Sequence, residues 1–466
     1  MKTTKRLRLV NYNYYKEIEQ KLELYAQKGL VLQKIGSFFW TFKKTEPQKL
    51  KYTVTYFAEG SIFNSHPTDN QQTYFDYAKA AGWDFVCEYN QMQIFCSSLD
   101  APPEFETDEA EQLENIHRCM KKSFVISQLL MLVAFALNLF LNLDRLRQNP
   151  TDFLSSNVDL CILLMMFGIV LYTSYSLISY YVWYIKSKKS IAVGGTILNS
   201  FHKNRRYFEI AYLVLLFSLV GYMFLHLFSS TSFGIIALSA VQLPLFALVF
   251  WGSITLLKKL KISAKANKII SSLLLVITGT LYLGFIFFAI SQFNFPERSN
   301  RPYTTVDWEM YSGMTREYRL YNDTIPLTCE DLYGDTGFEY YSYEAEKEST
   351  PALVKNSYSQ TRPPMKNAPP ALEYSIYKPK FDFVKSIVVS DLTELDDLSD
   401  RKLEALDNAL FSTEKAYSFY WEDAGGRFFT GEYILVFTDR IIHIVAETPF
   451  TAEQIETVRD KLLINS

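Results

Sequence analysis

Five runs of apolar residues, each long enough to cross a lipid bilayer, occupy the middle of this chain. A helix needs about 20 apolar residues to span the hydrocarbon core, and one charged side chain at its centre costs about 2.5–3.5 kcal/mol. Four runs contain no charged residue, and the third contains only Glu209, near its start. We therefore expect a polytopic α-helical membrane protein with about five transmembrane helices, at residues 123–143, 160–185, 207–228, 233–257 and 269–293.

The charge of the chain is distributed unevenly. The whole chain has a formal net charge of -3, but residues 123–290 carry 13 basic and only 4 acidic residues, whereas residues 291–466 carry 18 basic and 30 acidic ones. Such segments differ too much to form one soluble domain. We predict a membrane domain between two soluble ones, with boundaries at 1–98 for the first domain, 99–122 for a linker and juxtamembrane helix, 123–293 for the membrane domain and 294–466 for the last domain.

The loops between the apolar runs indicate their orientation. Residues 186–206 contain six basic residues and no acid, and residues 258–268 contain five lysines and no acid. The alternate loop 144–159 has two arginines against three aspartates. Because basic loops stay on the cytoplasmic side, we expect a multi-pass protein of the cell membrane with its N-terminus in the cytoplasm and its C-terminus outside.

The first domain has a mixed α and β pattern. Residues 5–11 read as a strand, and residues 14–29 as an amphipathic helix that ends at Gly29. Alternating aromatic residues at 38–42 and 52–56 predict two strands, followed by a helix at 70–81 and a strand pair at 83–95. The motifs YAQKGL and YAKAAGW echo each other at the ends of the two helices. This order predicts a ferredoxin-like α+β domain.

The same segment resembles a known bacterial family. The motifs KGL, SFFWTFKK, LKYTVTYF, YFDYAKAAGWDFV and QIFCSS, over about residues 5–98, resemble domain of unknown function 2812. Members typically carry tryptophan where this sequence has Leu30. The resemblance implies transmembrane helices behind the domain and genes that often neighbour PadR-type transcription regulators. It implies no activity and no catalytic residue.

The last domain also reads as α+β, with its order concentrated in the second half. Residues 296–375 lack sustained periodicity, and the proline-rich stretch 350–374 reads as an extended loop. We expect a helix at 399–411 and strands at 416–421, 427–437 and 440–446. Thr451 and Gln454 have the spacing of a capping box, which predicts a final helix from there to Leu463.

An acidic segment of this domain is the candidate binding site. Its aspartates could hold a cationic peptide or Ca²⁺, or they could simply lie at a helix N-terminus, where the helix dipole favours acids. We predict a weak partner-binding site there, formed by Asp391, Asp396, Asp397 and Asp400.

No motif in the sequence indicates a reaction. H-E-x-x-H, G-x-S-x-G and Walker A motifs are absent, and the cysteines do not have metal-binding spacing. His443 lies on an apolar strand without an obvious partner in the sequence. We expect a protein that is not an enzyme and has no cofactor or metal: a membrane sensor or signal-relaying protein. The alternative is an accessory or immunity-like subunit of a transport complex, and an envelope enzyme is a third hypothesis. The expected partners are the lipid bilayer, a protein partner or a second copy of the chain, and a cationic peptide, with no nucleic acid.

Overall fold

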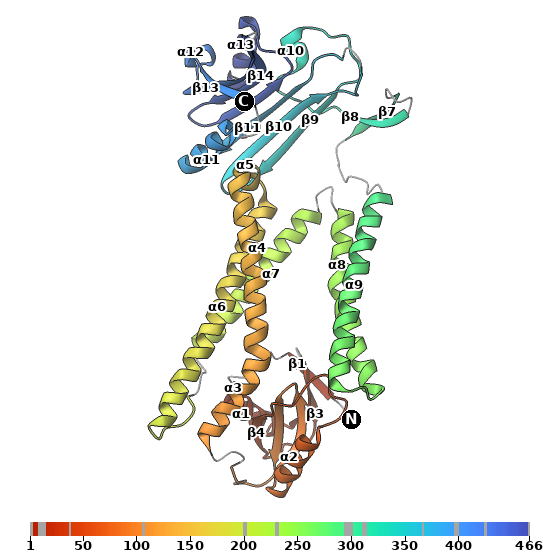
Figure 1. The fold of residues 1–466 in the computed structure, drawn as a ribbon, viewed down its shortest axis with the longest axis vertical. Helices are drawn as coiled ribbons and strands as arrows, with labels where there is room; N and C mark the ends of the chain where they lie inside the picture. Colours follow the sequence, from red (N-terminus) through yellow and green to blue (C-terminus); the bar gives the residue numbers. More distant parts are fainter. Residues whose placement is uncertain are drawn as a thin grey trace. The chain divides into compact units, whose positions relative to one another are not determined.

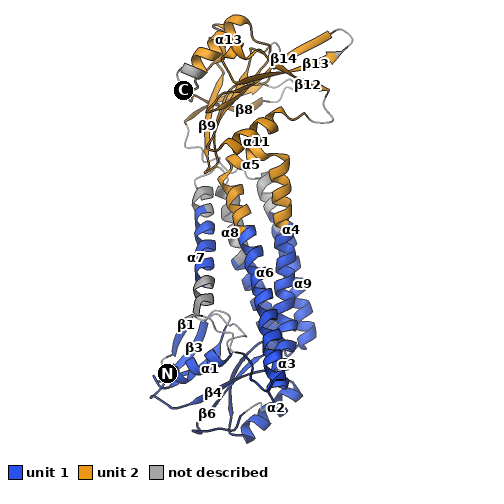
Figure 2. Cartoon of the chain, turned by 90° about the vertical axis from the view of Figure 1, so that its left-hand side faces the viewer, with its two compact units in different colours: residues 1–137, 166–297 blue, residues 138–165, 298–466 orange. Residues whose placement is uncertain are grey.

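The fold was analysed in a computed structural model of the full chain. The structure describes residues 3–7, 15–36, 39–104, 108–198, 203–228, 233–292, 302–309, 315–365, 368–395, 400–423 and 426–464. The chain divides into two compact units, which are coloured separately in Figure 2. Unit 1 comprises residues 1–137 and 166–297, and unit 2 comprises residues 138–165 and 298–466.

The N-terminal part of unit 1 contains two copies of a β-α-β-β motif. The first copy forms a three-stranded antiparallel sheet of order β1-β3-β2, and the second forms one of order β4-β6-β5. In each sheet the third strand of the motif therefore lies between the first and the second. The elements are β1 (Thr3–Leu7), α1 (Tyr15–Ala26), β2 (Leu30–Ile35), β3 (Phe39–Lys44), β4 (Lys51–Tyr56), α2 (Asp69–Ala80), β5 (Asp84–Tyr89) and β6 (Met92–Ser97).

The two copies match in detail. Gly29 and Gly82 follow the two helices with φ of 72° and 85°, a left-handed conformation that favours glycine. A Cβ atom on Gly29 would also lie 2.4 Å from the Thr45 carbonyl oxygen. The strand after each helix is irregular at an equivalent point, between Leu32 and Lys34 in β2 and between Phe85 and Cys87 in β5. The sequence echo at the helix ends thus marks a duplicated motif.

The ferredoxin-like prediction was wrong in topology, although α+β was right. A ferredoxin-like domain joins its strands in one sheet, whereas the six strands here form two sheets. The missing element in the prediction was β2, which follows Gly29 directly. Because an extra residue interrupts the pairing of β2 near Gln33, its apolar residues do not alternate regularly, and the period-2 signal is lost.

The hydrophobic core of this region extends beyond the two sheets. Trp40 and Phe42 of β3 lie at its centre and are 1% and 0% exposed. Helix α3 (Glu109–Met120) adds Leu113 and Ile116 to the same core, and α6 (Asn157–Ala192) adds Tyr180. Residues after 98 therefore complete the core of the N-terminal domain.

The helical part of the chain contains long apolar helices (Figure 1). Helix α3 continues through a π-helical segment, Lys121–Val125, into α4 (Ile126–Gln148). Three helical stretches in the described part are long and apolar enough to cross a membrane, at Glu109–Gln148, Asn157–Ala192 and Ala264–Tyr282. The last of these stretches belongs to α9 (Ala264–Gln292). The other helices of this part are α7 (Lys203–Phe228), α8 (Phe233–Lys259) and the short α5 (Pro150–Ser155).

Unit 2 is built on a seven-stranded antiparallel sheet of order β12-β13-β14-β15-β11-β10-β9. A separate hairpin, β7 (Tyr303–Glu309) and β8 (Thr315–Tyr321), precedes it. The sheet strands are β9 (Ser342–Ser349), β10 (Leu353–Thr361), β11 (Leu372–Pro379), β12 (Arg401–Leu406), β13 (Lys415–Asp423), β14 (Gly426–Val436) and β15 (Ile441–Ala446). Its helices are α10 (Cys329–Tyr333), α11 (Asp382–Thr393), α12 (Asn408–Phe411) and α13 (Ala452–Arg459).

Several predictions for this domain are confirmed, and two were wrong. Strands β13, β14 and β15 and helix α13 lie where the sequence predicted them, and Thr451 and Gln454 form the capping box. The predicted helix at 399–411 is instead strand β12 followed by the single turn of α12. The proline-rich stretch read as a loop contains β10, because its prolines cluster outside the strand.

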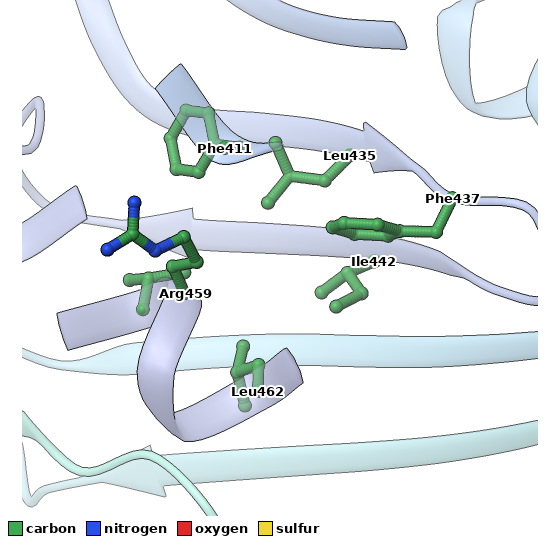
Figure 3. A pocket seen from close by; sticks show the side chains of 7 residues that line it. Phe411, Leu435, Phe437, Ile442, Arg459 and Leu462 are labelled. Carbon is green, nitrogen blue, oxygen red and sulfur yellow. The ribbon is translucent and has the colours of Figure 1, made fainter. Parts of the chain in front are cut away.

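Helices pack on both faces of this sheet. On one face, α10 and α13 cover a core that includes Leu372, Ile442 and Leu462. Figure 3 shows the side chains between α13 and the strands. The volume there that could hold a water-sized molecule is about 0 Å³, so this region is hydrophobic packing and not a ligand site. On the other face, α11 covers a second core around Ile434 and Ile441.

Candidate functional site

The predicted acidic site is not assembled as one cluster. Asp391, at the end of α11, accepts a hydrogen bond from the Thr151 backbone N–H over 3.0 Å. Asp400 is exposed just before β12. Asp396 and Asp397 lie outside the described residues. Of the predicted residues, Asp391 therefore has a structural partner, and that partner is 240 positions away in the sequence.

Asp391 belongs to a contact that holds helix α5 on the sheet domain of unit 2. It binds the first turn of α5, and Thr350 binds the last turn, since the Thr350 hydroxyl donates to the Leu154 carbonyl oxygen over 2.7 Å. Between these two bonds, Phe153 is 1% exposed. We call this contact the α5 latch. It consists of polar bonds at both ends of the helix and a buried aromatic ring between them.

Two further bonds fix the helices on either side of α5. The Asn157 amide, at the start of α6, donates to the Ser349 carbonyl oxygen over 2.6 Å. Arg145 near the end of α4 forms an ion pair with Asp159 of α6, at 2.8 Å between Nη1 and Oδ1. The ends of α4 and α6 that belong to unit 2 are thus tied to each other and, through α5, to the sheet.

At the other end of the same helices, α6 packs on α3 within unit 1. His117 Nδ1 lies 2.7 Å from the Tyr180 hydroxyl, and the His117 ring stacks on Tyr184 with centroids 4.0 Å apart. Glu109 of α3 accepts a hydrogen bond from the Ile197 backbone N–H over 2.9 Å. Because α3 completes the core of the N-terminal domain, α6 is packed against that domain.

A polar trough lies on the face of the unit 2 sheet that also carries α11. It has a volume of about 330 Å³, and three adjacent strands line it. Two cross-strand rows define it: Glu344, Ser359 and Glu373 in one, and Glu346, Ser357 and Ser375 in the next. Residues that pair directly across strands project from the same face. The trough therefore presents three carboxylates and three hydroxyls, a lining suited to a cation.

A charged row continues the trough on the neighbouring strands. His443 of β15 pairs directly with Ser375 of β11, and its Nε2 lies 2.9 Å from a Glu432 carboxylate oxygen. Arg401 of β12 also binds Glu432. Burial alone would raise the pKa of Glu432, but the hydrogen bond from His443 and the charges of His443 and Arg401 hold the pKa of Glu432 below its usual value. His443 thus has a carboxylate partner that the sequence analysis missed.

His443, Glu432 and Arg401 form one charged group on the sheet. The neighbour of His443 is a carboxylate already occupied by Arg401, in an arrangement that orients charges on a sheet face. Among the described residues, no group of three His, Cys, Asp or Glu side chains is placed to hold a metal ion.

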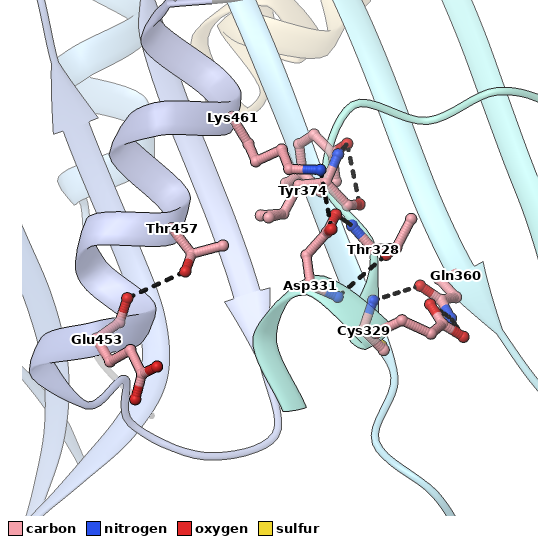
Figure 4. A network of polar contacts seen from close by, with 10 residues as sticks. Thr328, Cys329, Asp331, Gln360, Tyr374, Glu453, Thr457 and Lys461 are labelled. Carbon is pink, nitrogen blue, oxygen red and sulfur yellow. Dashed lines mark hydrogen bonds and ion pairs between the residues drawn. The ribbon is translucent and has the colours of Figure 1, made fainter. Parts of the chain in front are cut away.

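The last cysteine of the chain, Cys329, has a structural position. Cys329 is 0% exposed, and its backbone N–H donates to Gln360 Oε1 over 2.6 Å (Figure 4). Burial raises the pKa of its thiol to about 12. Nearby, Lys461 forms an ion pair with Asp331 at 2.9 Å, which ties the C-terminal segment to α10 (Figure 4). Cys329 is therefore an inert core residue.

Sequence signals for these features existed in part. The acids of β9 alternate as Glu344, Glu346 and Glu348, and this period-2 pattern predicts one acidic strand face. Glu432 and His443 each interrupt an apolar strand, which indicates that each has a partner. The partner of Asp391 had no such signal, since Thr151 contributes a backbone N–H.

Fold and site together define an α+β protein with helices suited to a membrane. Comparison with known families identifies its N-terminal part: residues 14–128 match the family described as "Protein of unknown function (DUF2812)", so the chain carries this domain. The match covers about a quarter of the chain and includes α3. Comparison with curated proteins and comparison with solved structures each gave no match.

Proposed function

We propose that this chain is a non-enzymatic membrane sensor that relays the state of its outer domain to its cytoplasmic domain. In this proposal α4, α6, α7, α8 and α9 cross the cell membrane, with the N-terminus in the cytoplasm and the sheet of unit 2 outside. The basic loops, at 186–206 and 258–268, support this orientation. The acidic trough receives a cationic ligand, for which a basic peptide is the leading candidate.

The proposal is based on the continuity of helix α6 between two packed ends. Helix α6 is continuous from Asn157, which binds the outer sheet domain within unit 2, to the segment around Tyr180, which packs on α3 within unit 1. The stretch from α3 to α4 is likewise continuous from Glu109 to Gln148. In this proposal a displacement at one end of the helix is passed along it to the other end. A π-helical segment, Lys121–Val125, lies where α3 meets α4, and such segments are found at functional sites.

The coupling is tested by releasing the α5 latch. The double variant Asp391→Ala/Thr350→Val removes both polar bonds, and Asp400→Ala/Thr361→Val removes an exposed carboxylate and a threonine hydroxyl from the same domain without touching α5. Hydrogen exchange of the full chain in lipid nanodiscs is the measurement. We expect faster exchange in α5 and also in α3 for the latch variant, and an unchanged pattern for the control. Faster exchange that stops within unit 2 would contradict the relay.

The alternative function is an accessory or immunity-like subunit of a transport complex. Long apolar helices without charged side chains at mid-depth are compatible with packing against another membrane protein. Purification in mild detergent separates the two proposals: a stoichiometric transporter would favour the accessory subunit, and a chain that purifies alone or with copies of itself would favour the sensor.

A further inference from the structure

The first sheet of the N-terminal domain has one face packed in the core and one face open. Trp40 and Phe42 of β3 point into the core. On the opposite face, Lys5 of β1 pairs with Thr41 of β3, and Thr41 pairs with Lys34 of β2, so these three residues form a row across the sheet. Lys5 and Lys34 are exposed.

This face carries positive charge. Phe39 and Lys43 flank the row, two residues before and after Thr41 on β3, so they share its face. Phe39 is 54% exposed. The three strands contain no acidic residue. Of their five basic residues, Lys5, Lys34 and Lys43 lie on this face, and Arg6 and Lys44 lie on the face of Trp40 and Phe42.

A second basic segment lies beside this face. Residues 258–268 contain five lysines, and residues 210–296 contain no acid. This segment comprises the end of α8, the turn after it and the start of α9, and we call it the α8–α9 turn. Lys34 is close enough to Lys258 to act on its charge: partial burial lowers the pKa of Lys258, Lys34 adds to the lowering, and Glu88 opposes it. Of these lysines, Lys259, Lys261, Lys265 and Lys268 are exposed.

The segment between β4 and α2 of the same domain contacts α8 and α9. The Asn267 amide of α9 donates to the Phe63 carbonyl oxygen over 3.1 Å, and the Phe63 ring contacts Phe250 of α8 with centroids 6.4 Å apart. Figures 1 and 2 both show β1 and β3 at the end of the N-terminal domain that adjoins the helices of unit 1. The N-terminal domain therefore adjoins α8 and α9, and Lys34 of the open face lies near Lys258 of α8.

We propose that the open face of the β1-β3-β2 sheet, together with the lysines of the α8–α9 turn, binds anionic phospholipid headgroups. The inference rests on the membrane insertion in the proposed function. Lysines next to a bilayer are attracted to its anionic lipids, and an exposed aromatic ring such as Phe39 is favoured at the bilayer interface. Continuity with the helix ends selects lipid over a soluble acidic partner, because a headgroup layer surrounds every membrane helix at that depth.

The test places a polarity-sensitive fluorophore on this face through Phe39→Cys in the full chain. The labelled protein is reconstituted in nanodiscs of phosphatidylcholine alone or with roughly one-third phosphatidylglycerol. We expect a blue-shifted, brighter emission in the anionic nanodiscs, which diminishes at high salt because the attraction is screened. In Lys5→Gln/Lys34→Gln the lipid-dependent change should fall by at least half. The matched control Lys28→Gln/Lys79→Gln, which removes two exposed lysines elsewhere in the domain, should retain it.

The outcomes separate this inference from the proposed function. Identical emission in both lipids, or a change that Lys5→Gln/Lys34→Gln leaves intact, overturns the lipid contact while membrane insertion stands. A salt-dependent shift that appears on adding a soluble polyanion but not with phosphatidylglycerol overturns it in favour of an acidic partner. Failure of the chain to enter nanodiscs would overturn both proposals.

Discussion

Glu19 of α1 is a half-buried acid with a clear consequence for stability. Its carboxylate accepts a hydrogen bond from the Val54 backbone N–H over 2.8 Å. Burial raises its pKa to about 7, although that bond and the charge of Lys16 oppose the increase. The folded domain therefore holds Glu19 protonated at a pH at which the unfolded chain would have ionised it.

This pKa predicts a pH-dependent stability. A pKa raised from 4.5 to about 7 favours folding below the unfolded value, and the benefit is lost as pH rises through the window between the two values. At 1.36 kcal/mol per pKa unit the loss is about 3 kcal/mol at most. Glu19→Gln should melt at a higher temperature than the wild type at pH 8 and show a flatter profile between pH 5 and 8. Glu111→Gln, an exposed acid on α3, is the control; equal slopes in the wild type and Glu19→Gln would contradict the assignment.

Single residues differ in how far the sequence predicts them. The alternation of Trp40 and Phe42 predicted a buried pair, and both are buried. The partners of Asp391 and His443 come from other elements, so neither is visible in the local pattern. Burial follows from periodicity, whereas a polar contact depends on the fold that brings two segments together.

At the scale of elements, the sequence predicted about five membrane-long apolar helices, and three such stretches are found among the described residues. A short segment was assigned to the wrong structure. Leu403, Leu406 and Leu410 have helical spacing, yet the first two lie in β12. A short apolar pattern is compatible with a helix or with a strand. Here the segment forms a strand because it pairs with β13. Helix α5 was also predicted wrongly, because the sequence analysis treated residues 144–159 as a loop. The packing of α5 on the sheet explains why this segment is helical.

The packing of α5 predicts the effect of removing its aromatic ring. Phe153→Ala should destabilise unit 2 by about 3–5 kcal/mol, as expected for a large buried side chain. Limited proteolysis of the full chain should then cut faster between residues 148 and 157. Phe140→Ala, which removes a ring from α4 that is 64% exposed, should leave the cleavage rate unchanged. Equal cleavage of α5 in both variants would show that the latch does not depend on Phe153.

At the scale of the whole molecule, charge and hydropathy predicted the apolar helices correctly, whereas the order of elements predicted the wrong sheet topology for the N-terminal domain. They indicated apolar helices between two polar regions, and the structure has such helices. They did not indicate that α3 and α6 complete the N-terminal core or that residues 138–165 group with the last domain. Both features arise from contacts between segments that are distant in the sequence. Local hydrophobic periodicity does not reveal such contacts.

In the proposed topology the N-terminal domain and the sheet domain of unit 2 lie on opposite sides of the membrane. Native cysteines cannot report this, because Cys329 and Cys87 are both buried. Exposed positions are available instead: Lys79 and Lys265 for the cytoplasmic side, and Asn149 and Asp439 for the outer side. Each is replaced singly by cysteine and treated in intact cells with a membrane-impermeant maleimide. We predict that Asn149→Cys and Asp439→Cys react in intact cells, and that Lys79→Cys and Lys265→Cys react only after permeabilisation. Reaction of Lys79→Cys and Asp439→Cys from the same side would contradict the account.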